Sequence, residues 1–428
     1  MNTSDCEVAL IGAGMAGLTA ARTLAEAGVR VAVLEARSRI GGRILTHRAG
    51  GYSLELGAEF VHGRPPELWA LIAEAGLETY QRGGSQGCFN GGSLQPCAED
   101  DRAFHLLEGL EDFSGPDVSF AQYLSTLKAS DSERASVTGF VEGFNAADAG
   151  EISAASLGAQ QKAEESIEGD QAFYVRGGYD RVAQYLAGRI VDYGGDILLN
   201  TPAREIHWSP GSVQIVTDDQ IFSTKCAVVT VPLGVLQAGS LIIEPRPETV
   251  LQAASQLRMG HACRFTLLFR EQFWTKLPRT SAIEDLGFLF SFGEMPPVWW
   301  TTHPDSTPLL TGWIGGPRSA ALANLTQEEL ADRACDTLAR IFAVKPNRIR
   351  QLLLGCYTHN WSGDPFALGA YSYVGAGGLD APKQMSEPVA DTLFFAGEHT
   401  DTTGHWGTVH AAMRSGLRVA YQILDLPG

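Results

Sequence analysis

Three glycines near the start of the chain have the spacing of a nucleotide-binding turn. Gly12, Gly14 and Gly17 form the pattern Gly-x-Gly-x-x-Gly, and Glu35 follows 18 positions after the last of them. In such a turn the first glycine allows a tight bend, the second lets the backbone approach a pyrophosphate, and the third lets a helix pack on a strand. A carboxylate about 20 residues further on can bind the hydroxyls of a ribose. These residues therefore predict a dinucleotide site.

The elements that would position this motif can be recognised on both sides of it. Residues 7–11 form a short apolar run, residues 15–27 place apolar side chains at helical spacing, and residues 29–34 form a second apolar run. Near-continuous apolar runs of this length are typical of parallel strands that are covered on both faces. We therefore expect a strand, a glycine turn, a helix and a second strand, with Glu35 at the end of that strand.

A second glycine turn follows directly and distinguishes between cofactors. It runs from Arg37 to Arg43 and contains Gly41 and Gly42. Its guanidinium groups can form paired hydrogen bonds to the pyrophosphate. Because a nicotinamide site does not need this second loop, we interpret residues 8–43 as an FAD-binding Rossmann unit.

The far end of the chain carries a third glycine-containing segment. Phe395 to Thr400 follows a predicted strand, and residues 407–409 begin a predicted final helix. The start of a helix presents backbone N–H groups and a partial positive charge, which can stabilise negative charge on the pyrimidine ring of a reduced flavin. Both ends of the chain are therefore expected to meet at one cofactor. Taken alone, Glu398 would be interpreted as an ordinary salt-bridged carboxylate.

Composition limits the classes of function. The chain has 428 residues, a formal net charge of −17 and 44% hydrophobic residues, and no apolar run approaches the ~20 residues that a membrane span needs. A negative field repels phosphate, so nucleic acid and anionic membranes are not expected as partners, whereas a cationic substrate is modestly favoured. The polar start of the chain, Met1 to Glu7, does not resemble a secretory signal, so a cytoplasmic location is expected.

Seven cysteines are scattered along the chain without a Cys-x-x-Cys pair. This spacing argues against a disulfide framework and against a structural zinc site. We therefore expect buried free thiols in a reducing compartment and no metal. The cysteines are Cys6, Cys88, Cys97, Cys226, Cys263, Cys335 and Cys356.

Length and patterning predict two domains that the chain enters more than once. Residues 1–78, 176–257 and 389–428 are assigned to a discontinuous α/β Rossmann-type FAD-binding domain, and residues 79–175 and 258–388 to an α+β substrate-binding domain. A strand-rich stretch that could extend the FAD domain is expected at 196–218, further strands at 227–231, 264–269, 309–314, 351–357 and 393–396, and helices at 120–127, 327–342 and 408–423.

Three more segments complete the pattern begun by the two glycine turns. They are Leu56 to Gly63, Val231 to Gly234 and Phe395 to Thr400. In this order and over nearly the whole chain, the motifs resemble the flavin-containing amine oxidase family, which includes monoamine oxidases, polyamine oxidases and flavin-dependent histone lysine demethylases. The resemblance is strongest to polyamine oxidases and their bacterial relatives. It implies an amine oxidase-like fold with FAD as the cofactor.

The resemblance also implies roles for individual residues around the cofactor. Glu35 would bind the adenosine ribose, and Arg43 and Glu398 would lie along the diphosphate and ribityl region. The backbone of Ala203 would meet adenine, and the amide of Val409 would reach the flavin. The full set of implied cofactor-binding residues is Gly12, Gly14, Ala16, Gly17, Glu35, Ala36, Arg37, Gly42, Arg43, Gly57, Ala58, Glu59, Ala203, Val231, Trp361, Gly397, Glu398, Gly407, Thr408 and Val409.

A further group of residues is implied to surround the amine. His62 falls where polyamine oxidases have a polar residue close to the substrate, and Trp361 matches a tryptophan near the isoalloxazine, although core packing explains Trp361 equally well. Aromatic walls suit an amine that must lose its proton, because they exclude water and favour the uncharged form. The predicted catalytic residues, which position the amine, are His62, Arg264, Trp361 and Tyr373, and the predicted substrate contacts are Tyr371, His405 and Trp406.

Two departures from the family pattern affect the expected chemistry. Monoamine oxidases attach FAD through a cysteine in the segment that corresponds to residues 369–373, which contains none here, so the FAD is expected to be non-covalent. The family lysine that holds a water at flavin N5 corresponds to Arg264. Arginine is planar and permanently charged, so Arg264 cannot be assumed to hold that water or to promote oxygen reduction equally well.

By resemblance, the expected reaction is hydride transfer from a neutral amine carbon to flavin N5, which gives an imine, then an aldehyde, and hydrogen peroxide from oxygen. Polyamines of the spermine and spermidine class are the expected substrates. Alternatives of the same fold stay open: an L-amino acid oxidase that uses Arg264 or Arg176 for the substrate carboxylate, a desaturase or porphyrinogen oxidase, and a flavoprotein with weak or no oxidase activity. A chromatin demethylase is the least favoured.

An acidic run formed by Glu164, Glu165, Glu168 and Asp170 offers one more candidate. On a helix, Glu164 and Glu168 would share a face and would repel each other unless a cation such as a distal ammonium group lay between them. A solvated acidic face explains the run better, so these residues are left out of the predicted site.

Overall fold

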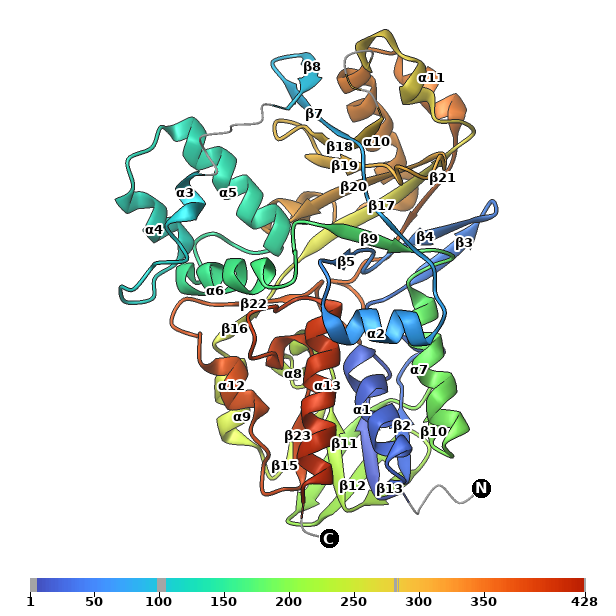
Figure 1. The fold of residues 1–428 in the computed structure, drawn as a ribbon, viewed down its shortest axis with the longest axis vertical. Coiled ribbons are helices and arrows are strands. Elements are labelled where there is room, and N and C mark those ends of the chain that lie inside the picture. The colour runs from blue at the N-terminus through green and yellow to red at the C-terminus, as the bar shows by residue number, and fades with distance from the viewer. Residues whose placement is uncertain (1–5, 98–104, 281–282, 284, 427–428) are drawn as a thin grey trace.

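One half of the molecule is built on a five-stranded parallel sheet (Figure 1). The computed structural model describes residues 6–97, 105–280, 283 and 285–426, so residues 1–5 of the polar chain start lie outside the described residues. The strand order is β10 (Asp196–Leu198), β2 (Val31–Leu34), β1 (Val8–Ile11), β14 (Cys226–Val229) and β23 (Leu393–Phe395). All strands but β10 are buried along their whole length, as their apolar sequences predict.

Helices cover one face of this sheet. α1 (Met15–Glu26) lies between α13 (Val409–Leu424) and α7 (Asp180–Asp192), and α2 (Pro66–Glu74) also packs on α13 (Figure 1). α1 and α13 approach closely because Gly416 has no side chain: a Cβ there would lie 2.4 Å from the Ala16 carbonyl oxygen. The predicted strand, turn, helix and strand at the N-terminus and the predicted C-terminal helix are confirmed.

A second, four-stranded sheet packs on the other side. Its order is β13 (Ile221–Thr224), β12 (Ser212–Thr217), β11 (Ala203–Ser209) and β15 (Ile242–Glu244), and its apolar side chains share a core with Ala9 and Ile11 of β1. The strand-rich stretch predicted at 196–218 therefore divides: β10 extends the parallel sheet, whereas β11 and β12 belong to this separate sheet. The same core includes side chains of α8 (Leu233–Gln237), α9 (Glu248–Ala254) and α12 (Ala381–Ser386).

The other half of the molecule is built on a seven-stranded sheet, at the top of Figure 1. Its apolar core also contains side chains of α10 (Gln327–Phe342) and α11 (Pro346–Leu352), and α10 spans the range that the sequence predicts. The strand order is β21 (Leu353–Thr358), β17 (Ala262–Phe269), β20 (Leu309–Gly315), β19 (Val298–Trp300), β18 (Leu286–Phe290), β7 (Ser85–Asn90) and β8 (Ser93–Pro96).

Small ladders and a helical group connect the two halves. β5 (Val61–His62) and β6 (Thr79–Gln81) both pair with β9 (Ala172–Val175), and β16 (Leu257–Met259) pairs with β22 (Ser372–Val374). The helical group consists of α3 (His105–Glu108), α4 (Phe120–Thr126), α5 (Asp131–Asn145) and α6 (Ala154–Glu165), and a separate hairpin is formed by β3 (Thr46–Ala49) and β4 (Tyr52–Glu55). No helix in the described part of the chain has the length and apolarity needed to cross a membrane.

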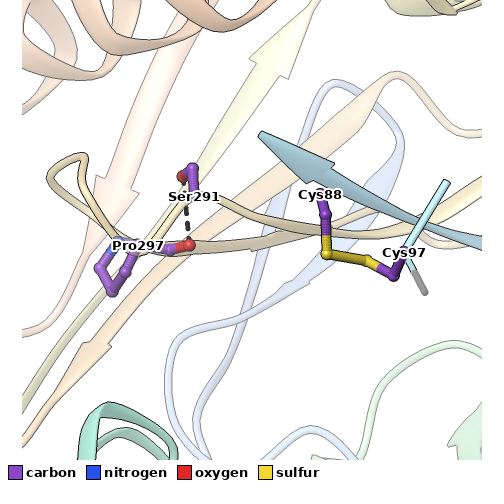
Figure 2. Close-up of a disulfide and its surroundings, with 4 residues drawn as sticks. All are labelled: Cys88, Cys97, Ser291 and Pro297. Atoms are coloured by element: carbon purple, nitrogen blue, oxygen red, sulfur yellow. Dashed lines mark hydrogen bonds between the residues drawn. A yellow bond between two sulfur atoms is a disulfide. The ribbon is translucent and has the colours of Figure 1, made fainter. Parts of the chain in front are cut away.

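Two sequence expectations are wrong. Cys88 on β7 and Cys97 just after β8 form a disulfide across this hairpin (Figure 2), because strand pairing brings two cysteines nine positions apart to opposite sides of a turn. The remaining five cysteines are free, and only Cys226 and Cys335 among them are fully buried. In addition, α6 ends at Glu165 and Glu168 has a left-handed backbone, so Glu164 and Glu168 do not share a helix face.

Candidate functional site

A single cavity of about 1530 Å³ runs from the parallel sheet into the other half of the molecule. It begins at the carboxyl ends of the strands, at Ile11 and Leu34, which end β1 and β2, at Val231 after β14 and at Gly397 after β23. This is where open α/β sheets bind their ligands. All predicted site residues line the cavity except Gly17 and His405.

The first glycine turn forms one end of the cavity. Gly12 has a φ of +111°, and a Cβ at Gly17 would lie 2.0 Å from the Gly12 carbonyl oxygen, so Gly17 lets α1 pack on the turn without itself facing the cavity. Gly14 faces the cavity and precedes α1 without a side-chain cap, and the first turn of α1 contains no acidic residue. The N–H groups at this helix start are therefore available to an anion such as a pyrophosphate.

Glu35 is fixed at the end of β2 beside this turn. Its two carboxylate oxygens accept hydrogen bonds from the backbone N–H of Ala13 (2.8 Å) and of Arg37 (2.9 Å), and the residue is buried. Each oxygen keeps a lone pair, so the carboxylate can also accept from the paired hydroxyls of a ribose. The glycine turn and Glu35 together fit the diphosphate and ribose of a dinucleotide.

The second glycine turn is connected to a distant loop. The guanidinium of Arg37 donates to Asp364 at 2.7 Å and lies over the ring of Phe366, and the other oxygen of Asp364 contacts the His359 imidazole at 2.7 Å. Burial alone would raise the pKa of Asp364, but His359 and Arg37 hold it well below its usual range. An ionised Asp364 therefore ties residues 359–366 to the predicted cofactor region.

Arg43 joins the second glycine turn to the C-terminal segment. Its guanidinium donates to Glu398 at 2.8 Å, and Glu398 also accepts from the backbone N–H groups of Ser372 (3.3 Å) and Gly407 (3.1 Å). Burial would raise the pKa of Glu398, but Arg43, together with His399 and the Ser372 hydroxyl, keeps the pKa below its usual value. Glu398 is thus a salt-bridged carboxylate, and this ion pair joins two cavity-lining segments that are far apart in the sequence.

The last helix also faces the cavity with its start. Thr408 precedes α13, and its hydroxyl accepts from the N–H of Ala411 at 3.1 Å. Gly407, Thr408 and Val409 line the cavity, and Gly407 has a φ of +77° that places Tyr371 within 2.9 Å of where its Cβ would be. The partial positive charge of this 16-residue helix therefore points at the same space as that of α1.

Trp361 packs directly against the turn that contains Gly57. A Cβ at Gly57 would lie 1.9 Å from the Arg43 carbonyl oxygen and 3.1 Å from the Trp361 ring. The indole N–H donates to the Leu56 carbonyl at 2.8 Å, and Trp361 is 5% exposed. Trp361 is therefore both a buried core residue and part of the cavity wall.

Arg264 is held in a buried ion pair. Its guanidinium lies 2.6 Å from Glu59 and donates to the Gly57 carbonyl at 2.8 Å, and Glu59 also accepts from the Trp300 indole at 2.9 Å. The Arg264 Nε is buried and has no hydrogen-bond partner in the described part of the protein. Arg264 lines the cavity, but its charge is neutralised by Glu59.

Beyond this pair the cavity wall becomes aromatic. Phe288 stacks on Phe290 (ring centroids 5.8 Å apart) and on Trp300 (5.7 Å), and Trp313 lies parallel to Tyr371 at 6.4 Å. Because side chains alternate along a strand, Phe288 and Phe290 share the cavity face of β18. Other aromatic wall residues are Phe60, Phe140, Phe144, Phe292, Tyr373 and Trp406.

His62 lies within this aromatic part. Its ring meets Phe60 edge to face at 5.8 Å and Phe144 at 6.3 Å. Burial and the charge of Arg82 lower the pKa of His62 to about 4, so the imidazole is neutral at pH 7. A neutral imidazole can accept or donate a hydrogen bond without adding charge.

The two tyrosines of the segment 369–373 have different hydroxyl partners. Tyr371 donates to the Phe144 carbonyl at 2.5 Å, whereas the Tyr373 hydroxyl lies 3.3 Å from Glu151 and accepts from the Asp148 N–H at 3.4 Å. Burial raises the pKa of Tyr373 to about 12, so this phenol stays protonated. Both tyrosines line the cavity, where they contribute ring surface.

His405 does not reach the cavity. Its imidazole contacts the Ala163 carbonyl at 3.0 Å and, on the other side, Thr403 (3.0 Å) and Arg414 (2.8 Å). Its neighbour Trp406 does line the cavity. The predicted substrate contact of His405 is therefore not carried forward.

Several lining residues were missed at the sequence level. They include Arg82, which follows β6, and Phe144 on α5, and the acidic residues Glu164, Glu165, Glu168 and Asp170 also line the cavity. Burial raises the pKa of Glu164 to about 7. The spacing of Phe288, Phe290 and Phe292 was a usable signal, whereas nothing local marks Arg82. No cluster of three or more potential metal ligands occurs in residues 6–97, 105–280, 283 and 285–426.

The chain is similar to known proteins over nearly its whole length. A family model described as flavin containing amine oxidoreductase matches residues 15–424. Polyamine oxidase 2 of Arabidopsis thaliana is 29% identical over 456 residues, which cover 98% of this chain and 88% of that protein. Lysine-specific histone demethylase 1 homolog 2 of the same plant is 28% identical, over 99% of this chain but 59% of that protein.

A solved structure extends the comparison to the fold. Wild-type putrescine oxidase bound to putrescine has a TM-score of 0.84 to this chain at 23% identity, with 98% of this chain and 99% of that chain covered. This similarity confirms the predicted fold class, a Rossmann-type nucleotide-binding half joined to a substrate-binding half. The residue boundaries of the two domains stay a prediction.

Proposed function

The chain belongs to the flavin-containing amine oxidoreductase family, and we propose that it binds FAD non-covalently and oxidises the C–N bond of amines, with polyamines as the substrate class. The observation that carries this proposal is the continuity of the cavity. One volume joins the glycine turns and Glu35, which suit a dinucleotide, to an aromatic chamber that contains His62. A cofactor and a small organic substrate can therefore meet within one cavity.

The residues around the first part of the cavity fit FAD. The N–H groups at the start of α1 would hold the diphosphate, Glu35 the adenosine ribose, Arg43 and Glu398 the adjoining linker, and the start of α13 the pyrimidine edge of the flavin. With FAD bound, the expected chemistry is two-electron oxidation of the amine carbon to an imine, which water converts to an aldehyde, with oxygen reduced to hydrogen peroxide.

The residues of the second part would prepare the amine. Hydride leaves readily from the carbon next to an uncharged nitrogen, so the bound amine must lose its proton. Aromatic walls exclude water and disfavour a charged amine, and the neutral imidazole of His62 can hydrogen-bond to the uncharged nitrogen. We propose His62, Trp361, Tyr371, Tyr373 and Trp406 as the residues that position the substrate.

Two kinds of observation support polyamines as the substrate class. The chain is similar to a polyamine oxidase and shares its fold with a putrescine oxidase. The carboxylates of Glu164, Glu165, Glu168 and Asp170 also border the cavity and could attract distal ammonium groups. Neither arginine that the sequence offered for a substrate carboxylate is available, because Arg264 is paired with Glu59 and Arg176 with Asp305.

The cofactor proposal has a direct test. Purified protein should be yellow, and acid or heat denaturation should release FAD into the supernatant, where it is identified by chromatography. Flavin that stays with the precipitated chain would contradict non-covalent binding, and FMN in place of FAD would contradict the assignment of Glu35.

The substrate proposal is tested by an anaerobic screen in a stopped-flow instrument. Spermine, spermidine or a related diamine should bleach the visible flavin band within a single turnover, and in air the same amine should yield hydrogen peroxide. If no di- or polyamine bleaches the band, the polyamine class is wrong. Parallel L-amino acids and simple monoamines distinguish the other amine-oxidising alternatives.

A further inference from the structure

One of the arginines that line the cavity has no opposite charge to neutralise it. Five arginines face the cavity, and four of them form ion pairs: Arg37 with Asp364, Arg43 with Glu398, Arg204 with Asp218 and Arg264 with Glu59. Arg82 is the fifth, and within the described residues it has no ion-pair partner. Its charge therefore acts on whatever enters the cavity.

Arg82 is held in place by backbone and ring contacts. Its backbone N–H donates to the Ala172 carbonyl at 2.8 Å, which continues the pairing of β6 with β9. Its guanidinium lies 4.3 Å from the centre of the Phe288 ring. Phe288 belongs to the stacked aromatic wall, so the charge of Arg82 lies on the surface of the substrate chamber. It is half-buried, and burial lowers its pKa from the usual value.

No group around Arg82 forms an ion pair with it within the described residues. His62 of β5, Tyr80 of β6 and Tyr174 of β9 are titratable but neutral at pH 7: the pKa of His62 is lowered by burial and by Arg82, and those of both tyrosines are raised by burial. Other charged or titratable groups of this region are His303, which packs beside Gly83, the Glu59–Arg264 and Asp305–Arg176 pairs, and the wall carboxylates Glu111, Glu164, Glu165, Glu168 and Asp170.

We propose that Arg82 makes the aromatic chamber select the uncharged form of an amine, by repelling its ammonium form. As the amine passes from water to the chamber, its N–H bond breaks heterolytically: the electron pair stays on nitrogen, and the proton goes to bulk water. The same repulsion should exclude permanently charged cations, which have no proton to lose. A like charge next to an ionisable group typically changes its pKa by about one to three.

The inference rests on the proposed function only where it concerns the reacting amine, so its first test does not use turnover. Benzyltrimethylammonium, a permanent cation with an aromatic ring, is titrated calorimetrically into the flavin-loaded protein at pH 8. Removal of the charge in Arg82→Gln should tighten binding about tenfold, and Arg82→Lys should bind like the wild type. If Arg82 only supported the structure of the chamber, Arg82→Gln would weaken binding of the cation instead.

Arg176 provides a matched control. Arg176 directly follows β9, the strand that pairs with β6, and its guanidinium lies 4.5 Å from the centre of the Tyr80 ring. Unlike Arg82, it is paired with Asp305 and does not line the cavity. Arg176→Gln should therefore leave the affinity for the cation unchanged. If Arg82→Gln binds the cation no more tightly than the wild type, or if Arg176→Gln tightens binding equally, the inference is overturned.

The second test follows the reacting amine itself. The limiting rate of anaerobic flavin reduction is measured from pH 6 to pH 10 with an amine that the screen has identified. Without the positive charge the bound amine holds its proton more strongly, so the apparent pKa of the rate profile should rise by about one in Arg82→Gln, while Arg82→Lys should keep the wild-type profile.

The outcomes separate this inference from the proposed function. If no amine reduces the flavin, the proposed function fails, while the calorimetric result still decides the role of Arg82. An unshifted pH profile in Arg82→Gln would overturn the inference. So would a loss of affinity confined to carboxylate-bearing amines, tested with L-phenylalanine against 2-phenylethylamine, because Arg82 would then be an anion-binding residue.

Discussion

The two ends of the cavity treat charge in opposite ways. At the end formed by the glycine turns, the arginines that line the cavity (Arg37, Arg43 and Arg204) are paired with carboxylates of the protein, and the helix starts and Glu35 are arranged for one ligand. At the aromatic end, Arg82 and the wall carboxylate Glu164 have no ion-pair partner among the described residues, whereas Glu168 is paired with Arg64. The first end is built for a resident cofactor, whereas the second leaves charge uncompensated to select what enters.

The Glu59–Arg264 pair lies between the two ends and should show the largest effect. Glu59→Gln leaves the buried guanidinium of Arg264 without its counter-ion, which should lower the free energy of unfolding by about 3–5 kcal/mol in chemical denaturation. The double variant Glu59→Gln, Arg264→Gln should be less destabilised than Glu59→Gln alone, because it leaves no buried guanidinium without a counter-ion. Additive losses in the double variant would contradict a coupled pair.

An exposed ion pair serves as the control for that experiment. Arg350 and Asp332 lie 2.7 Å apart with side chains that are 33% and 59% exposed. Asp332→Asn should change the free energy of unfolding by less than about 1 kcal/mol, because solvent screens such pairs. An equal loss at both sites would mean that burial is not what makes the Glu59–Arg264 pair important.

The first glycine turn should show the next largest effect. A Cβ at Gly17 would meet the Gly12 carbonyl oxygen at 2.0 Å, so Gly17→Ala must push α1 away from the turn. We expect a loss of about 2–3 kcal/mol in stability and a purified protein with little bound flavin. Gly188→Ala in α7, where a Cβ would meet nothing within 4 Å, should keep both stability and flavin content. Normal flavin content in Gly17→Ala would count against the dinucleotide site.

The loop that carries Asp364 should have a smaller effect, limited to cofactor affinity. Asp364→Asn removes the charge that Arg37 and His359 share, so residues 359–366 should be held less firmly over the cofactor region. FAD dissociation, followed by the rise in flavin fluorescence, should accelerate about tenfold. An unchanged dissociation rate would show that this connection stabilises the loop without contributing to cofactor retention.

The pH dependence of the aromatic end should be the smallest effect. The pKa of Glu164 is raised to about 7, so the residue is neutral below that pH and negative above it. The affinity for benzyltrimethylammonium should therefore rise a few-fold between pH 6 and pH 8, and Glu164→Gln should remove this rise. Folding stability should change in the opposite direction: it falls as pH rises from the usual carboxyl pKa towards 7, because only the unfolded chain ionises there. A pH-independent affinity in the wild type would rule out this role for Glu164.

The cofactor end of the molecule could be predicted almost completely from the sequence. Its determinants are local: glycines at fixed spacing, apolar runs of strand length and a carboxylate at the end of β2 all act within residues 8–43. The final helix could also be predicted from the sequence, because Thr408 and the apolar spacing that follows define its start. Each of these features depends on near neighbours in the chain.

The substrate end could be predicted only in part, because its residues meet through long-range packing. Arg82 becomes exceptional only when the other four cavity arginines are seen to be paired. The Glu59–Arg264 pair joins residues 205 positions apart, and the Cys88–Cys97 disulfide depends on a hairpin that cysteine counting cannot reveal. Of the neighbours His405 and Trp406, only Trp406 lines the cavity, and this difference depends on how the segment folds.

The central claim is amine oxidation in this cavity, and one anaerobic experiment tests it most directly. Purified protein with its bound FAD is mixed with spermidine, putrescine or a simple monoamine in the absence of oxygen, and the flavin band and the carbonyl product are quantified. At least one amine should bleach the band and yield one equivalent of aldehyde per flavin. A protein that holds FAD but is bleached by none of these amines would contradict the central claim.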